Sequence, residues 1–119
     1  MTFAKSRKFG ATTLALFMGL TPSWANDWVA LDENGIVEAL SGRKLQYENA
    51  WQDFRASGAT LYNAGQDSWG TWTTRGAQYC SQWPPSARWA CFDVALSEDG
   101  TKVRFEGTGN DISIGVYTD

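Results

Sequence analysis

Residues 70–94 read GTWTTRGAQYCSQWPPSARWACFDV, and this stretch decides the fold. It holds three runs rich in Thr, Tyr, Trp, Phe and Val, separated by the turn signals Arg75-Gly76 and Pro84-Pro85. β-branched and aromatic residues favour strands, whereas Gly and Pro favour the turns between them. The stretch therefore predicts three consecutive antiparallel strands.

The second hairpin also predicts a disulfide bond. If residues 84–87 form a four-residue turn, Cys80 lies opposite Cys91 and Tyr79 lies opposite Phe92. Opposed residues in a non-hydrogen-bonded strand pair have the short separation that a disulfide requires. Two cysteines in an exported chain more often form a bridge than remain free thiols. We therefore expect a Cys80–Cys91 bridge.

Turn signals continue along the rest of the chain. Glycine-bearing turns recur every eight to twelve residues or so, at Ser57-Gly58, Ala64-Gly65, Asp99-Gly100 and 107–110. This rhythm is typical of an antiparallel meander. We expect a mainly β domain of seven or eight strands that forms a small barrel or a strongly bent sheet.

One short helix is expected before the strands. The apolar residues of segment 34–41 have helical spacing, and Gly42 follows as a natural stop. Asp32 or Asn34 is the expected N-cap.

The expected turns also assign side chains to faces of the sheet. A turn centred on Arg75-Gly76 and one around Glu98-Asp99 extend the Tyr79–Phe92 pair into one row of facing aromatic residues: Trp72, Tyr79, Phe92 and Phe105. The same register places Val94 opposite Val103. By the alternation of the pleat, Trp83 shares the face of this row, and Trp89 and both cysteines lie on the other face.

The N-terminus has the layout of an export signal. Lys5, Arg7 and Lys8 precede an apolar run over 9–20, and small residues end at Ala25. This pattern predicts cleavage after Ala25. The apolar run is too short for a membrane span, which needs about 20 residues. We expect a periplasmic or secreted protein with no membrane span after cleavage.

The mature chain would be one small domain, residues 26–119. Seven Lys and Arg and thirteen Asp and Glu would remain, giving a net charge of −6. The cations are scattered along the sequence, whereas a nucleic-acid interface needs them clustered. Nucleic acid is therefore not an expected partner.

The composition argues against catalysis. The sequence contains no histidine, which removes the Ser-His-Asp and Cys-His arrangements and the common zinc hydrolase sites. The carboxylates mostly lie in or beside expected turns, where a solvated surface role is the simpler interpretation. We expect no enzyme activity, no cofactor and no metal site.

Tryptophan makes binding the favoured function. Trp51, Trp69, Trp83 and Trp89 cannot all belong to the aromatic row. They either cover the second face and the helix, or are displayed for stacking on a sugar or for lining a small apolar pocket.

The Pro84-Pro85 turn is the expected binding edge. Consecutive prolines stiffen its tip, and Trp and Arg are enriched at binding hot spots. Trp83 and Arg88 are expected to face each other in a cation–π contact, with Trp89 beside them. The hypothesis is a binding surface made of Trp83, Arg88 and Trp89.

Nearly the whole mature chain resembles a broad group of small, uncharacterised exported bacterial β proteins. The pattern comprises Leu40-Ser41-Gly42, Trp51 with Phe54, Leu61-Tyr62, Gly70-Thr71-Trp72, and Gly76-Ala77-Gln78-Tyr79-Cys80 followed by a second cysteine. The resemblance implies no known activity.

A shorter stretch is similar to the paired motifs of the periplasmic inhibitors of c-type lysozyme. It comprises Ala56-Ser57-Gly58-Ala59 with Tyr62, then Trp72 and Arg75-Gly76-Ala77. Those inhibitors are small β-barrels that place a serine and a lysine into the acidic cleft of the enzyme. The resemblance implies these roles for Ser57 and Arg75. Arg75 replaces the lysine, Leu61 interrupts the first motif, and both cysteines fall in one hairpin.

Three functions thus remain open from the sequence. The first is a non-catalytic exported module that binds an unknown protein or small ligand. The second is an inhibitor of c-type lysozyme, and the third is a carbohydrate-binding module that uses exposed tryptophans.

The export signal and the bridge make a joint prediction about the mature protein. Protein from periplasmic extract or culture medium should begin at Asn26, and its intact mass should show the loss of residues 1–25 and of two hydrogens. Alkylation without prior reduction should leave the mass unchanged. Two alkylated cysteines would contradict the bridge.

Overall fold

The computed structural model describes residues 28–119, so the expected signal segment 1–25 lies outside the described residues. The described part contains one helix, α1 (Glu33–Leu40), and nine strands. The strands are β1 (Trp28–Ala30), β2 (Arg43–Gln46), β3 (Trp51–Phe54), β4 (Ala59–Asn63), β5 (Asp67–Arg75), β6 (Gln78–Gln82), β7 (Trp89–Ser97), β8 (Lys102–Glu106) and β9 (Ile112–Tyr117).

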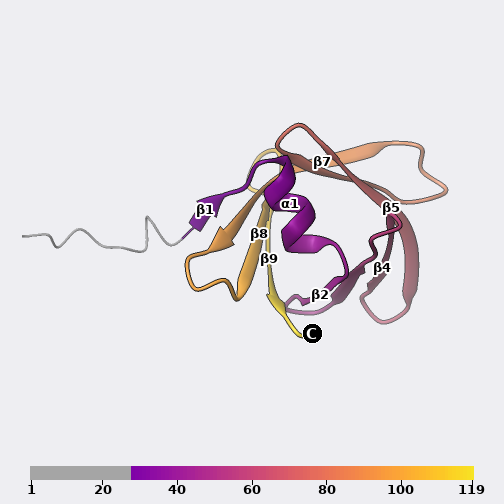
Figure 1. Ribbon diagram of the computed structural model, residues 1–119. Helices are drawn as coiled ribbons and strands as arrows, with labels where there is room; N and C mark the ends of the chain where they lie inside the picture. Colours follow the sequence, from indigo (N-terminus) through magenta and orange to yellow (C-terminus); the bar gives the residue numbers. More distant parts are fainter. Residues whose placement is uncertain (1–27) are drawn as a thin grey trace, which may run out of the picture.

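The strands form a closed antiparallel barrel. Strands β2 to β7 follow one another as neighbours, β8 pairs with both β7 and β9, and β9 pairs with β2 and completes the circle (Figure 1). The short strand β1 adds to the edge of β7 beyond the end of β6. The expected mainly β fold with a short N-terminal helix is confirmed, in its barrel form.

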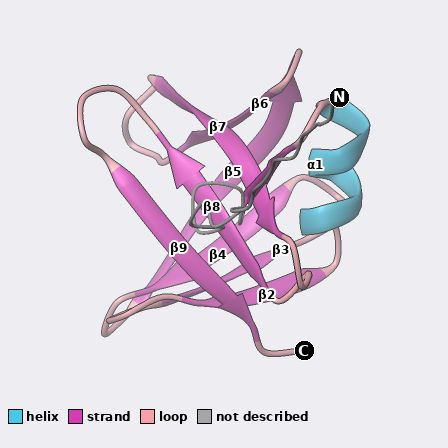
Figure 2. Cartoon of the chain, turned by 90° about the vertical axis from the view of Figure 1, so that its left-hand side faces the viewer, coloured by secondary structure: helices cyan, strands magenta, loops and turns pink. Residues whose placement is uncertain are grey.

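Helix α1 covers one end of this barrel. Its N-cap is Asp32, whose Oδ1 accepts a hydrogen bond of 2.8 Å from the Gly35 backbone N–H. Ile36 and Leu40 are fully buried against the barrel core. Figure 1 shows the helix in front of the barrel, and Figure 2, turned by 90°, shows it at one end.

The antiparallel order sorts the turns between the two barrel ends. Each strand reverses the direction of the one before it, so successive turns alternate between ends. The chain enters β2 directly from α1, so the helix-covered end holds the turns 55–58, 76–77 and 98–101. The opposite end, which we call the open end, holds the connections 47–50, 64–66, 83–88 and 107–111.

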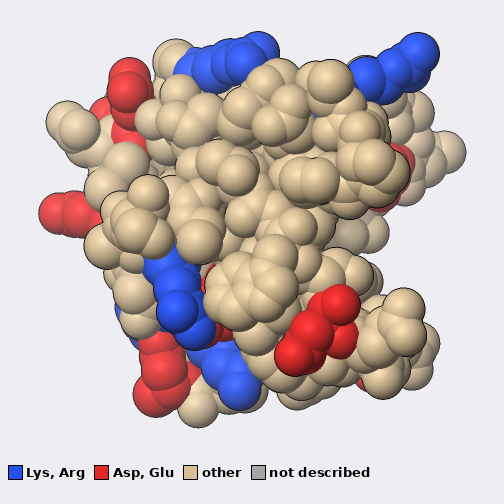
Figure 3. All heavy atoms as spheres, turned by 90° about the vertical axis from the view of Figure 1, so that its right-hand side faces the viewer, with Lys and Arg blue, Asp and Glu red and all other residues tan. Residues whose placement is uncertain are grey.

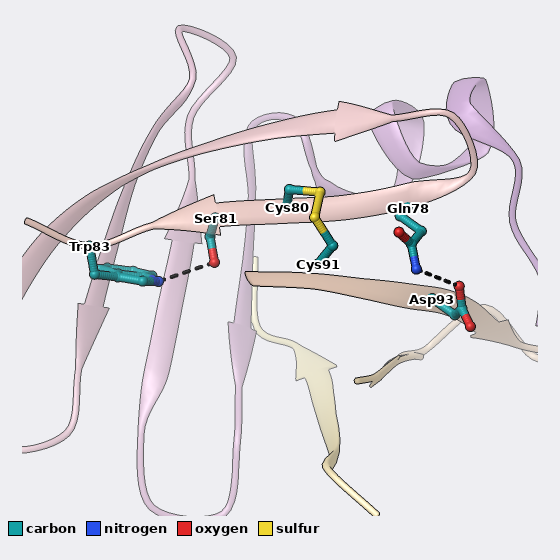
Figure 4. The surroundings of a disulfide bond; sticks show 6 residues. All are labelled: Gln78, Cys80, Ser81, Trp83, Cys91 and Asp93. Atoms are coloured by element: carbon teal, nitrogen blue, oxygen red, sulfur yellow. Dashed lines mark hydrogen bonds between the residues drawn. A yellow bond between two sulfur atoms is a disulfide. The ribbon is translucent and has the colours of Figure 1, made fainter. Parts of the chain in front are cut away.

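The cysteine hairpin has the expected register. Cys80 pairs with Cys91 and Tyr79 pairs with Phe92. The two cysteines form a disulfide with a Cα–Cα distance of 4.0 Å (Figure 4). A bridge that closes a loop of this length stabilises a domain by about 2–3 kcal/mol.

Two other expected registers are wrong by two residues. Trp72 pairs with Ser81 rather than with Tyr79, because the turn is the two-residue segment Gly76-Ala77, with Gly76 at a φ of +58°. Phe105 pairs with Val94 rather than with Phe92.

The second shift has its cause in the β7–β8 turn. Ser97 Oγ accepts hydrogen bonds from the backbone N–H groups of Thr101 and Lys102, and Asp99 Oδ1 also accepts from Thr101. These bonds centre the turn one position later than expected, so Leu96 pairs with Val103. Because both shifts are even, every side chain keeps its expected face.

The expected aromatic row is therefore part of the core. Trp72, Tyr79 and Phe105 are buried, and Phe92 packs against them at half-burial. Phe54, which was not assigned to the row, lies at their centre, 5.8–6.1 Å from the rings of those three core residues.

Tryptophans on the outer face have a different role, because each is covered by a cation. Trp51 lies under Lys44, Trp69 under Arg55, Trp89 under Arg75 and Trp28 under Arg104, at 4.2–5.1 Å from the charged group to the ring centroid. With Arg43 over Tyr117, five of the seven Lys and Arg of residues 28–119 make such contacts. Figure 3 shows that the cations on the face drawn there form no continuous basic patch.

The contrast between the two faces gives a stability prediction. Trp72 is 7% exposed, its indole N–H donates to the Arg55 carbonyl, and its ring packs against Phe54 and Tyr79. Trp72→Ala should lower the free energy of unfolding by about 3–5 kcal/mol. Trp89→Ala should cost clearly less, because the ring is half-buried on the outer face and its contact with Arg75 is worth about 0.5–1 kcal/mol. Urea denaturation of the two variants measures both, and equal losses would contradict the assignment of faces.

A candidate ligand site at the open end of the barrel

The open end of the barrel contains a cavity of about 690 Å³. This volume lies within the usual range for small-ligand sites, about 300–1,000 Å³. Its lining comes from eight strands or their flanking turns: Tyr47, Gln52, Tyr62, Asp67, Ser68, Trp69, Tyr79, Ser81, Trp83, Pro84, Phe92, Phe105 and Ser113. The cavity and the helix thus lie at opposite ends of one barrel.

A chain of aromatic rings, which we call the aromatic girdle, surrounds the cavity. It runs from Trp83 through Tyr62, Tyr47 and Phe105 to Phe92, and neighbouring ring centroids are 6.0–6.5 Å apart. Adjacent planes are inclined at 41–85°, so no two neighbours in the girdle stack on each other. Neighbouring rings therefore meet edge to face or at a tilt rather than face to face.

The floor of the cavity is a buried hydrogen-bond network centred on Gln52. Its carboxamide oxygen accepts from the Tyr47 hydroxyl at 2.8 Å, and its Nε2 donates to Thr60 Oγ1 at 2.9 Å and to the Tyr79 hydroxyl oxygen at 3.2 Å. Thr60 in turn donates to the Asp53 carbonyl. Gln52 is 5% exposed and Thr60 is fully buried. The bonds compensate for burying these polar groups and fix the Gln52 side chain.

Both floor tyrosines are held in the neutral form. Burial raises the pKa of the Tyr47 phenol far above its usual range, and the neighbouring Tyr79 and Tyr62 raise it further. Burial also raises the pKa of Tyr79, and its hydrogen bonds with Ser81 and Gln52 oppose that shift in part. Both hydroxyls therefore keep their protons at neutral pH, and the network carries no charge.

Trp83 occupies the mouth of the cavity in a fixed position. Its indole N–H donates to Ser81 Oγ at 3.1 Å (Figure 4), and its ring meets Tyr62 edge to face. The ring lies directly on the backbone of Gly70, where an added Cβ would fall 2.5 Å from the indole. A glycine is thus required at position 70 to admit the Trp83 ring into the barrel.

The cavity lining has one charged residue, the exposed Asp67. Its Oδ1 accepts a hydrogen bond from Asn63 Nδ2, which holds the carboxylate at the β4–β5 turn. The other ionisable groups in the turns of the open end are Glu48, Arg88 and Asp111. Neither lysine nor arginine lines the cavity, so its electrostatic character is negative.

The three residues of the expected binding edge do not meet at one surface. Trp83 points into the barrel, Trp89 lies on the outer face under Arg75, and Arg88 is exposed in the loop between them. The expected contact between Trp83 and Arg88 is wrong, because the strand pairing ends at Gln82 and Trp89. The loop therefore spans six residues, of which Trp83 and Pro84 line the cavity and Arg88 does not.

Ser57 and Arg75 are both exposed at the helix-covered end. Ser57 lies in the β3–β4 turn and its Oγ accepts from the Ala59 backbone N–H, whereas Arg75 ends β5 and lies over Trp89. The two turns are neighbours, since the Trp72 backbone N–H donates to the Gly58 carbonyl. The two residues thus share one rim, opposite the cavity.

Sequence reasoning missed most of the cavity lining. Gln52, Tyr47 and Tyr62 were assigned no role, although Gln52 and Tyr62 are directly paired on β3 and β4. Gln52 lies two residues before the apolar Phe54 in a short strand, so the alternation of the pleat places both on one face, and this was the available signal for an inward polar residue.

Within residues 28–119, no three His, Cys, Asp or Glu side chains are grouped as a metal site would require, and no helix is long and apolar enough to cross a membrane. Comparisons with protein-family models, characterised proteins and solved structures found no match.

Proposed function

We propose that the protein is a non-catalytic binding protein of the periplasm or the extracellular space, which takes a small, largely apolar ligand into the open end of its barrel. The observation that carries this proposal is the asymmetry of the barrel. One end is filled by Ile36 and Leu40 of α1, and the other is left as an aromatic cavity of about 690 Å³.

The rigidity of the lining supports the proposal. The Gln52 network fixes Tyr47 and Tyr79, and Gly70 and Ser81 fix Trp83. A preformed site loses little conformational entropy when a ligand binds. The disulfide stabilises the β6–β7 hairpin that carries Trp83, and it suits an oxidising compartment.

Dye binding tests the site. The uncharged aromatic dye N-phenyl-1-naphthylamine should bind with an increase in its fluorescence. Ser113→Trp should weaken binding at least tenfold, because Ser113 lies opposite Phe105 in the lining and the new indole fills the cavity. The matched control is Ile114→Trp, the next residue along β9, whose side chain is exposed on the outer face.

Melting temperatures of both variants should stay within a few degrees of the wild type, which separates filling of the cavity from unfolding. Equal dye affinity in the two folded variants, or no dye binding by the wild type, would contradict the proposal.

Inhibition of a c-type lysozyme is the second candidate, and the shared rim of Ser57 and Arg75 favours it. The acidic chain would also attract a basic lysozyme. The carbohydrate alternative has less support, because the outer tryptophans have cations on their rings.

Lysozyme activity assays test the second candidate. If the protein is an inhibitor, it should abolish lysozyme activity at a stoichiometric ratio. The double variant Ser57→Ala with Arg75→Ala should leave the lysozyme active, whereas Ser113→Trp, at the other end of the barrel, should still inhibit it. Full lysozyme activity in a tenfold excess of the wild-type protein would exclude this function.

A further inference from the structure

We propose, on the basis of the proposed ligand site, that the ligand is an organic cation of the alkylated or quaternary ammonium class. The aromatic girdle and Asp67 together have the features that such a cation requires.

The arrangement of the rings in the aromatic girdle suits a cation. An ammonium group is attracted to the negative face of an aromatic ring within about 6 Å of the centroid, and several rings around one site form an aromatic cage. The girdle provides rings from five different segments of the chain, inclined to one another and not stacked. A cation in the cavity would thus lie among aromatic rings on several sides.

The distribution of the protein's own charges also favours a cationic ligand. Five of the seven cations of residues 28–119 lie over outer rings, whereas the inner girdle has no lysine or arginine in its lining. Aromatic rings on the outer face of the barrel therefore have cations of the protein over them, whereas the lining that contains the girdle has no cation. Asp67, whose carboxylate is held by Asn63 at the β4–β5 turn, supplies the one negative charge among the residues of the lining.

The cavity is unfavourable for an anionic ligand. An anionic ligand would lose its hydration in the cavity and meet the Asp67 carboxylate with no cationic partner in the lining, which is unfavourable. The neutral floor neither attracts nor repels a charge strongly. It offers the Tyr79 hydroxyl and the Gln52 oxygen for a polar substituent on the ligand.

Three probes of one shape test the proposal. They are choline, its uncharged carbon isostere 3,3-dimethylbutan-1-ol, and the anion 3,3-dimethylbutanoate, each used to displace N-phenyl-1-naphthylamine from the wild-type protein. Choline should displace the dye at a concentration at least tenfold lower than the isostere, and the anion should be the weakest. Asp67→Asn should weaken choline severalfold and leave the isostere unchanged.

Asp93→Asn is the matched control for Asp67→Asn, because Asp93 is an exposed carboxylate on the outer face, paired with Gln78. Equal displacement by choline and the isostere, or displacement by neither from protein that binds the dye, would overturn the cationic ligand and leave the cavity as a site. Failure of the dye itself to bind would overturn the ligand site, and this proposal with it.

Discussion

Burial of Ile36 and Leu40 in one end of the barrel is the constraint from which the other features follow. A closed barrel of eight strands has an interior about wide enough for its own side chains or for one small ligand. Here the two helix residues, with Phe54 and Trp72, fill the interior at one end completely. The helix cannot reach the opposite end, so the inward residues there line a cavity rather than pack against a partner. The position of an eight-residue helix thus decides where the core stops and the cavity begins.

The barrel uses aromatic residues in two ways, and the cations distinguish them. On the outer face Arg and Lys lie over Trp and Tyr rings, which shields apolar surface and keeps long side chains ordered. On the inner face of the open end, the rings surround a neutral network built on Gln52 and have no cation beside them. The first arrangement stabilises the surface of a small acidic domain, and the second lines the cavity with aromatic rings.

Local turn chemistry explains how far the sequence could be interpreted. The Pro84-Pro85 hairpin was placed correctly as far as Cys80 and Cys91, because prolines confine the turn. In the two neighbouring hairpins the observed strand pairing differs from the expected pairing by two residues. Gly76 and the side chain of Ser97 centre these turns one residue later than the sequence indicated. A register shift of two residues leaves each side chain on the same face of the sheet. The core residues were therefore predictable, although their cross-strand partners were not. The cavity was not predictable, because it depends on which end the helix covers and on closure of the barrel through β7–β8 and β2–β9, and no short motif encodes either.

The indole N–H signals of the protein offer the most direct test of a barrel sealed at one end and open at the other. The six tryptophans of residues 28–119 report on separate places: Trp83 at the cavity mouth, Trp69 in the cavity lining with Arg55 over its ring, Trp72 in the core beside the helix, and the other three on the outer face. Their signals in a two-dimensional ¹H–¹⁵N spectrum can be assigned with single Trp→Phe variants and followed while N-phenyl-1-naphthylamine is added. The account predicts a large shift at Trp83 and almost none at Trp28, Trp51 and Trp89. A spectrum in which Trp51 or Trp89 shifts while Trp83 stays still would contradict it.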